Sequence, residues 1–176
     1  ILDGDAGMFC ADWVKTVLAE LDTLTSRELK RPAKIFVLSI MGLQSSGKST
    51  LLNLMFGTQL QASAGRCTRG VYLQLVRSER PEYDYVLLLD TEGIRSPEFH
   101  GLDDSQIRDN RLATFGLLPA DASIFMISNE DDSGLKEVLP MVMLAFKGSR
   151  IAENYGHTIR SKMVFVYRSV DTNDQT

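Results

Sequence analysis

Gly42-Leu-Gln-Ser-Ser-Gly-Lys-Ser49 is the stretch that decides the fold of this chain. It fits the pattern G-x-x-x-x-G-K-[ST] of a phosphate-binding loop. An apolar run at 35–41, typical of a buried strand, precedes it, and residues 50–56 continue it as a helix that closes at Gly57. The order strand, glycine-rich loop, helix is the context that the pattern requires. The sequence therefore predicts binding of a nucleoside triphosphate; an accidental match in a glycine turn is the alternative.

Each residue type in this loop has a physical role in holding phosphate. Gly42 and Gly47 let the backbone turn so that successive N–H groups point inward and form an anion nest. The helix that begins there adds the positive end of its dipole. Lys48 would supply a cation to the β- and γ-phosphates, and the Ser49 hydroxyl is an oxygen ligand suited to Mg²⁺. The nucleotide-binding residues expected here are Gly42, Gln44, Ser45, Ser46, Gly47, Lys48, Ser49 and Thr50.

Length and composition fit one domain with a substantial core. The chain has 176 residues, a formal net charge of −4 and two cysteines. The negative charge argues against a general nucleic-acid-binding surface, and the sparse cysteines indicate a reducing compartment, with a single disulfide as the alternative. No apolar run reaches the roughly 20 residues of a membrane span. Because the chain starts with Ile1 and ends in a polar tail at 171–176, we expect a piece of a longer protein.

Apolar periodicity predicts the order of the elements. An amphipathic leading helix is expected within residues 1–31, with Trp13 in the core or against a neighbour outside this chain. Strands are expected at 34–41, 71–76, 83–90, 122–127 and 162–167, and further helices at 48–57, 104–118 and 133–152. The short turn between the second and third strands predicts an antiparallel hairpin. Apolar strands alternating with helices predict an α/β fold with a mainly parallel sheet, one antiparallel strand and helices on both faces.

A second motif, Asp90-Thr-Glu-Gly93, follows the third expected strand. An Asp at the carboxyl end of a buried strand can hold the Mg²⁺ shell beside the phosphate loop, and Gly93 allows a backbone N–H to approach a γ-phosphate closely. The spacing D-x-x-G is weak by itself and gains weight from its place one hairpin after the loop. Glu92 lies within reach of the γ-phosphate by position, or is structural.

Between the two motifs lies Ala64-Gly-Arg-Cys-Thr-Arg-Gly70. A threonine in a loop just before the second strand can complete the Mg²⁺ shell and sense the γ-phosphate. Thr68 is the candidate; a polar loop that merely joins a helix and a strand is the alternative. The candidate metal ligands are therefore Ser49, Thr68 and Asp90.

Four ordered segments resemble the dynamin superfamily of large GTPases, most closely the guanylate-binding-protein and atlastin branch and, within it, the very large interferon-inducible GTPases. These segments are 42–53, 63–70, 89–93 and Asp109-Asn-Arg-Leu-Ala-Thr-Phe115. In particular, Thr68-Arg-Gly70 is similar to the family's Thr-[Lys/Arg]-Gly, and Asp90 to Gly93 is similar to its Asp-x-Glu-Gly. The resemblance covers residues 34–171.

The resemblance implies a phosphate-loop G domain over residues 32–176, truncated at its carboxyl end. It also implies hydrolysis of GTP to GDP with Mg²⁺, assembly through the nucleotide faces of two G domains, and a location in the cytosol and, as a further candidate, the nucleus. Contact with a membrane surface in a full-length protein stays open. The residues expected to take part in catalysis are Ser45, Arg66, Thr68 and Gly93.

One departure from the family concerns the charge that assists hydrolysis. Guanylate-binding proteins carry an arginine at the position of Ser45, and Ser45 has no charge to offer. The pair Gln44-Ser45 is more similar to dynamin, where the corresponding serine helps to organise a monovalent cation. Our hypothesis is that compensation comes from such a cation near Ser45, or from Arg66 or Arg69, although both arginines could equally be solvated loop residues.

A second departure concerns the guanine base. G domains usually place [Asn/Thr]-Lys-x-Asp after the fifth strand, whereas this chain has Arg168-Ser-Val-Asp171, which keeps the Asp and lacks the lysine. Guanylate-binding proteins have a shortened Arg-Asp version. Asp171 is therefore the candidate guanine reader and Arg168 a candidate stacking residue, with a capping Asp in a polar tail as the alternative.

Two other functions stay open at this point. One is a nucleotide-binding scaffold with negligible hydrolysis, because no activating side chain is evident. The other is an ATPase or a nucleotide-dependent kinase of the same phosphate-loop class.

Overall fold

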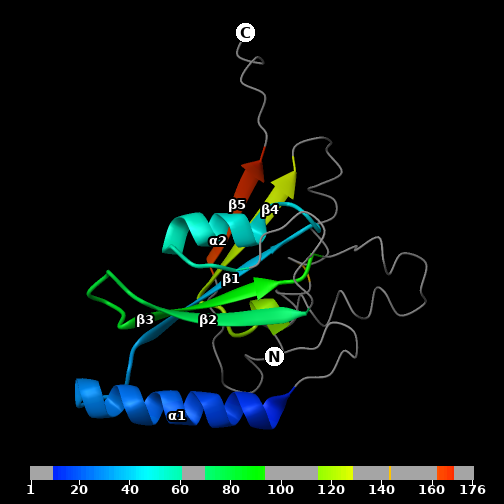
Figure 1. The fold of residues 1–176 in the computed structure, drawn as a ribbon. Coiled ribbons are helices and arrows are strands. Elements are labelled where there is room, and N and C mark those ends of the chain that lie inside the picture. The colour runs from blue at the N-terminus through cyan, green and yellow to red at the C-terminus, as the bar shows by residue number, and fades with distance from the viewer. Residues whose placement is uncertain (1–9, 61–69, 94–114, 129–142, 144–161, 169–176) are drawn as a thin grey trace.

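A computed structural model describes residues 10–60, 70–93, 115–128, 143 and 162–168. In chain order the elements are α1 (Ala11–Leu29), β1 (Ile35–Gly42), α2 (Lys48–Phe56), β2 (Val71–Arg77), β3 (Tyr85–Thr91), β4 (Ala122–Ser128) and β5 (Lys162–Arg168) (Figure 1). Each expected strand and both fully described helices are present, with bounds that differ by at most a few residues. The helix expected at 133–152 lies outside the described residues except for Met143, which is helical.

The five strands form one sheet in the order β2-β3-β1-β4-β5. β2 runs antiparallel to β3, with Arg77 opposite Tyr85 and Val71 opposite Thr91, so the predicted hairpin is confirmed. The pairs β1–β3, β1–β4 and β4–β5 are parallel. A mainly parallel sheet with one antiparallel strand is therefore confirmed, and the carboxyl ends of β1, β3, β4 and β5 lie along the same edge.

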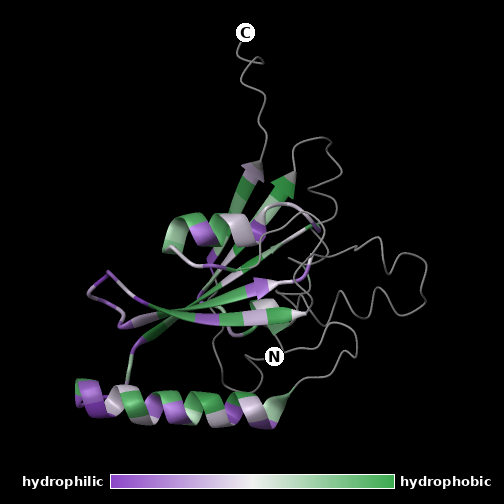
Figure 2. Cartoon of the chain, viewed as in Figure 1, coloured by the Kyte–Doolittle hydropathy of each residue, from purple (hydrophilic) through white to green (hydrophobic). Residues whose placement is uncertain are grey.

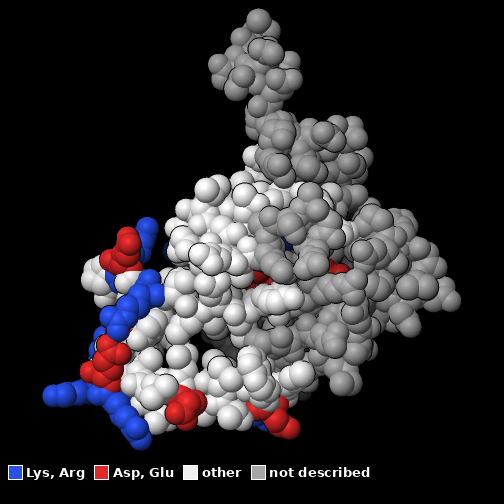
Figure 3. Space-filling model, viewed as in Figure 1, with Lys and Arg blue, Asp and Glu red and all other residues white. Residues whose placement is uncertain are grey.

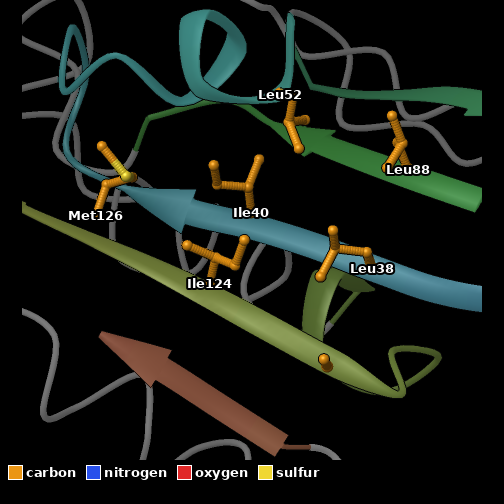
Figure 4. Close-up of a cluster of buried hydrophobic side chains, with 7 residues drawn as sticks. Leu38, Ile40, Leu52, Leu88, Ile124 and Met126 are labelled. Carbon is orange, nitrogen blue, oxygen red and sulfur yellow. The ribbon is translucent and has the colours of Figure 1, made fainter. Parts of the chain in front are cut away.

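The larger core lies between the sheet and α2. Leu52 of α2 is fully buried, and its side chain lies against strand residues that project from one face of the sheet (Figure 4). This buried cluster consists of Leu38, Ile40, Leu52, Leu88, Ala122, Ile124 and Met126. Hydrophobic residues run along the strands and polar ones gather in the β2–β3 turn (Figure 2). Burying this apolar area fixes α2, and with it the loop that leads into the helix, at one position over the sheet.

A second cluster covers the opposite face of the sheet. Val71 and Leu89 are its buried members, with Val37, Leu73 and Phe115 packed against them. Residues 115–117 are helical, which agrees with the end of the helix expected at 104–118, whose earlier part lies outside the described residues. Helical segments therefore contact the sheet from both sides.

α1 lies beside the β2–β3 hairpin and leaves much of its apolar surface exposed. Trp13 is 57% exposed and Leu24 is 54% exposed, so the expectation of a core position for Trp13 is wrong. Thr25 is the buried residue of this helix. No helix within the described ranges is both long and apolar enough to cross a membrane.

Two ion pairs connect the carboxyl end of α1 to the hairpin. Arg31 donates two hydrogen bonds to the carboxylate of Asp84, at 2.7 and 2.8 Å, and Arg77 donates to Glu28 at 2.6 Å. Side chains of both signs gather along this side of the molecule (Figure 3). The leading helix is thus connected to the hairpin near its carboxyl end by charged side chains.

Candidate functional site

The phosphate-binding loop joins the end of β1 to the start of α2. Gly47, with φ of +88°, immediately precedes α2, so the chain enters the helix through a left-handed turn. Lys48 is only 6% exposed, and its ammonium donates to the carbonyl oxygen of Leu43 at 2.8 Å and to that of Gly42 at 3.4 Å. A buried lysine therefore lies over the loop, with its charge directed at the loop's own carbonyl groups.

The other predicted residues of the loop occupy distinct environments. Ser45 is exposed and has a φ of +61°, whereas Ser46 is buried. Thr50 is exposed on the first turn of α2. The loop thus presents Ser45 outward and holds Ser46 inside its turn.

Ser49 and Asp90 are brought together by two neighbouring strands. The Ser49 hydroxyl, on the first turn of α2, donates to Oδ2 of Asp90 at 2.7 Å. Asp90 comes near the end of β3 and is 2% exposed. β3 pairs with β1 in parallel, which places the end of β3 beside the loop that follows β1. A hydroxyl and a carboxylate at this spacing are hard oxygen ligands that fit Mg²⁺, which prefers few protein ligands and keeps several waters.

Gly93 lies directly against the phosphate-binding loop. A Cβ at this position would overlap the backbone nitrogen and Cα of Gln44. Only glycine allows so close an approach of two backbones. The segment after β3 and the loop after β1 therefore meet at the edge of the sheet.

Glu92 contacts the start of β2 instead of standing free at the site. Its backbone N–H donates to the carbonyl oxygen of Gly70 at 2.7 Å, and its Oε2 accepts the N–H of Gly70 at 2.6 Å. The sequence left two roles open for Glu92, one near the γ-phosphate and the other structural. The hairpin register contained the missing signal, because pairing Val71 with Thr91 puts Gly70 opposite Glu92.

Several predicted site residues lie outside the described part of the chain. These are Arg66, Thr68, Arg69 and Asp171. Arg168 is the last residue of β5. Since β5 is parallel to β4, β5 ends, at Arg168, along the same edge of the sheet as the phosphate-binding loop.

Comparison with known proteins assigns the family. The model of the URGCP-like GTPase domain matches residues 1–174. Human interferon-induced very large GTPase 1 is 41% identical over 151 residues, which are 83% of this chain and 6% of that protein. Mouse up-regulator of cell proliferation is 29% identical over 170 residues, or 94% of this chain and 17% of that protein. The SEY1 homolog of Dictyostelium discoideum is 42% identical over 80 residues, covering 42% of this chain and 9% of that protein.

The chain thus spans less than a fifth of the length of these relatives. The resemblance to very large interferon-inducible GTPases is confirmed. The structure is similar to that of an Era variant from Aquifex aeolicus bound to GDP and AlF4⁻, with a TM-score of 0.51 and 20% identity over 76% of this chain and 51% of that one. That likeness confirms the phosphate-loop fold. The chain belongs to the family of URGCP-like GTPase domains.

Proposed function

We propose that this domain binds GTP through the loop at 42–49, hydrolyses it to GDP and phosphate with Mg²⁺, and associates with a second copy through its nucleotide face. The contact between Ser49 and Asp90 at 2.7 Å carries the proposal. It brings two ligands suited to Mg²⁺ next to Lys48, a buried cation on the same turn of α2. This is the arrangement that phosphoryl transfer by a phosphate-loop protein requires.

Each residue of the described site has a proposed task in that reaction. The ammonium of Lys48 now donates to two carbonyl groups of the loop, and phosphate oxygens would replace them as acceptors. Ser49 and Asp90 would hold Mg²⁺, directly and through its waters. The ion, when bound, neutralises charge on the β- and γ-phosphate oxygens.

The hydrolytic step itself transfers the γ-phosphoryl group to water. The water oxygen bonds to the γ-phosphorus, the bond from that phosphorus to the bridging oxygen breaks, and GDP leaves with the electron pair. One proton of the water passes to another oxygen of the phosphate, and the other proton stays on the attacking oxygen. The backbone N–H of Gly93, at the edge of the loop, is our candidate donor to the γ-phosphate, and Thr68 is our candidate for completing the Mg²⁺ shell.

The charge that assists this step is a separate question. We propose a monovalent cation near Ser45, or the side chain of Arg66 or Arg69, as its source. Ser45 is exposed on the loop and has no charge. GTP turnover in K⁺, Na⁺ and a large inert cation, for wild type and Arg66→Ala, distinguishes these sources. Equal rates under all of these conditions would exclude the cation and Arg66 as the source.

Guanine recognition is proposed for Asp171, with Arg168 stacking on the base. The parallel pairing of β5 with β4 supports this, because β5 then ends, at Arg168, along the edge of the sheet where we propose that the phosphates bind. Asp171→Asn should lower GTP affinity and relax the preference for GTP over ATP. An unchanged ratio of the two affinities would rule Asp171 out as the base reader.

One experiment separates the proposed function from its alternatives. Phosphate release under multiple turnover is measured with GTP and with ATP over a range of protein concentrations, with Lys48→Met as the inactive reference. Release from GTP alone, at a rate per molecule that rises with concentration, is the expected result. Binding of GTP without release would identify a scaffold, and equal release from ATP would identify an ATPase.

Association is checked on the same samples by light scattering. A shift from monomer to dimer with a non-hydrolysable GTP analogue, and not with GDP, is expected. A protein that hydrolyses GTP at a rate independent of concentration and stays monomeric would contradict the assembly part of the proposal alone.

A further inference from the structure

The carboxylate of Glu92 is buried and faces Gly70, the residue opposite Glu92 across the β2–β3 hairpin. Glu92 is 4% exposed. It forms two bonds with the same residue: its N–H donates to the Gly70 carbonyl at 2.7 Å, and its side-chain Oε2 accepts the Gly70 N–H at 2.6 Å. Both backbone polar groups of Gly70 are therefore bound by one partner.

The position of this pair in the sheet explains why a side chain is needed. Val71 and Thr91 are the last paired residues of the β2–β3 ladder, and Gly70 and Glu92 come next. Gly70 has a φ of +74°, so the chain turns out of the strand there. A regular ladder ends where the backbone leaves the extended conformation. The side-chain carboxylate of Glu92 accepts the N–H of Gly70 in place of a backbone carbonyl, and so keeps Gly70 joined to β3 one position beyond the ladder.

The two residues of this contact are close in sequence to residues of the proposed nucleotide site. Thr68 precedes Gly70 by two residues, while Asp90 and Gly93 flank Glu92 along the chain. Gly93 in turn lies against Gln44 of the phosphate-binding loop. Glu92 therefore joins Gly70, at the start of β2, to the end of β3, where Gly93 meets the phosphate-binding loop.

We propose that Glu92 is a positioning residue that couples the start of β2 to the end of β3, so that Gly70 and Gly93 respond together to the γ-phosphate. This inference rests on the proposed GTP site. Glu92 acts through Gly70 and Gly93, without contact with the nucleotide. A hydrogen bond to a buried carboxylate is stronger than one to a neutral group, which suits a contact that holds Gly70 and the end of β3 together.

The first test measures the contact itself in the nucleotide-free protein. Amide hydrogen exchange at Gly70 is followed by NMR in wild type, Glu92→Ala, Glu92→Gln and Glu79→Ala, the last an exposed glutamate in the β2–β3 turn as a matched control. Glu92→Ala should speed exchange at Gly70 at least tenfold and leave the amide of Leu88 unchanged. Glu92→Gln keeps an acceptor oxygen and should give an intermediate rate. Wild-type exchange at Gly70 in Glu92→Ala would overturn the proposal.

The second test measures coupling to the γ-phosphate. The ratio of the dissociation constants for GDP and for a non-hydrolysable GTP analogue is compared among the same variants. Glu92→Ala should reduce this preference for the triphosphate at least fivefold with GDP affinity nearly unchanged, and Glu92→Gln should restore part of it. A ratio equal to that of wild type, despite faster exchange at Gly70, would make Glu92 purely structural and refute the coupling.

The two tests keep this inference distinct from the proposed function. Failure of wild type to bind GTP would refute the proposed function and is seen before any variant is compared. If the amide of Leu88 also exchanges faster in Glu92→Ala, the alanine variant is unfolded. The comparison between wild type and Glu92→Gln then decides the proposal. In that variant, unchanged exchange at Gly70 together with an unchanged affinity ratio would overturn the proposal.

Discussion

The backbone of Gln44 occupies the space where a side chain on Gly93 would stand. The two residues belong to different motifs, one after β1 and the other after β3, and the parallel pairing of these strands brings them together. Because the contact is between main chains, it leaves no room for adjustment by side-chain rotation. The phosphate-binding loop and Gly93 therefore form one continuous surface, which is the proposed binding surface for the γ-phosphate.

Gly93→Ala should damage this surface. The added methyl group must push the loop at Gln44 or the segment after β3 away, so we expect affinity for a non-hydrolysable GTP analogue to fall at least tenfold. A loss of this size corresponds to about 1.4 kcal/mol. Titration with a fluorescent nucleotide measures it.

Gly57→Ala is the matched control. Gly57 also has a positive φ, +62°, but nothing lies within 4 Å of an added Cβ there. The left-handed conformation should cost roughly 1–2 kcal/mol of stability and leave nucleotide affinity unchanged. Equal affinity losses in the two variants would show that the contact with Gln44 is not what matters.

Ser49→Ala should remove the dependence of GTP binding on Mg²⁺. The hydroxyl bonded to Asp90 at 2.7 Å is the proposed ligand, and losing one contact to a charged group weakens binding by about tenfold or more. We expect this loss in excess Mg²⁺ and equal affinities for wild type and variant in a chelator. Ser26→Ala on α1 is the control. A variant whose affinity still rises with Mg²⁺ as in wild type would exclude Ser49 as a ligand.

Leu52→Ala should destabilise the domain strongly. Leu52 is fully buried between α2 and the sheet, and truncation of a buried leucine leaves a cavity that costs about 2–5 kcal/mol. Leu54, on the same helix, is 79% exposed, so Leu54→Ala should change stability by less than about 0.5 kcal/mol. Urea unfolding of both variants measures the difference. Similar losses would mean that α2 does not pack through Leu52.

Acid should weaken the attachment of α1 to the hairpin. Hydrogen bonds from Arg31, and then from the backbone N–H of Lys34, lower the pKa of Asp84 from its ordinary 3.8 to about 2. A carboxylate with a lowered pKa stabilises the fold fully above pH 4, and this contribution is lost as the pH falls toward 2. Asp84→Asn should therefore lower the Tm at pH 6, and the gap to wild type should narrow between pH 4 and pH 2. A gap that stays constant over this range would contradict the assignment.

Glu28→Gln provides the control for that series. The Arg77–Glu28 pair also joins α1 to the hairpin, but its side chains are 74% and 57% exposed. Exposed ion pairs contribute little because water and salt screen them. The Tm of Glu28→Gln should therefore stay close to that of wild type at every pH.

Local patterns were sufficient for most of the fold. Residues 35–41 form a strand because a continuous apolar run can be buried on both faces of a parallel sheet. Lys48 opens α2 because the glycine before it allows the turn. The pattern of α1 predicted a helix and offered two positions for Trp13, of which the core position was wrong, because periodicity shows which face is apolar and not what covers it. The roles of Thr68 and Asp171 stay predictions.

The sequence by itself determined the order of the elements, the phosphate-binding loop and the residue types that suit triphosphate and Mg²⁺, since these depend on spacing along the chain. Only the tertiary structure decided which of those residues meet. Ser49 reaches Asp90, and Gly93 reaches Gln44, because β1 and β3 are parallel neighbours with a fixed register. Glu92 binds Gly70 because the hairpin ladder ends one residue earlier. The pairing of β1 with β3 is a relation between segments far apart in the chain, and no local pattern specifies it.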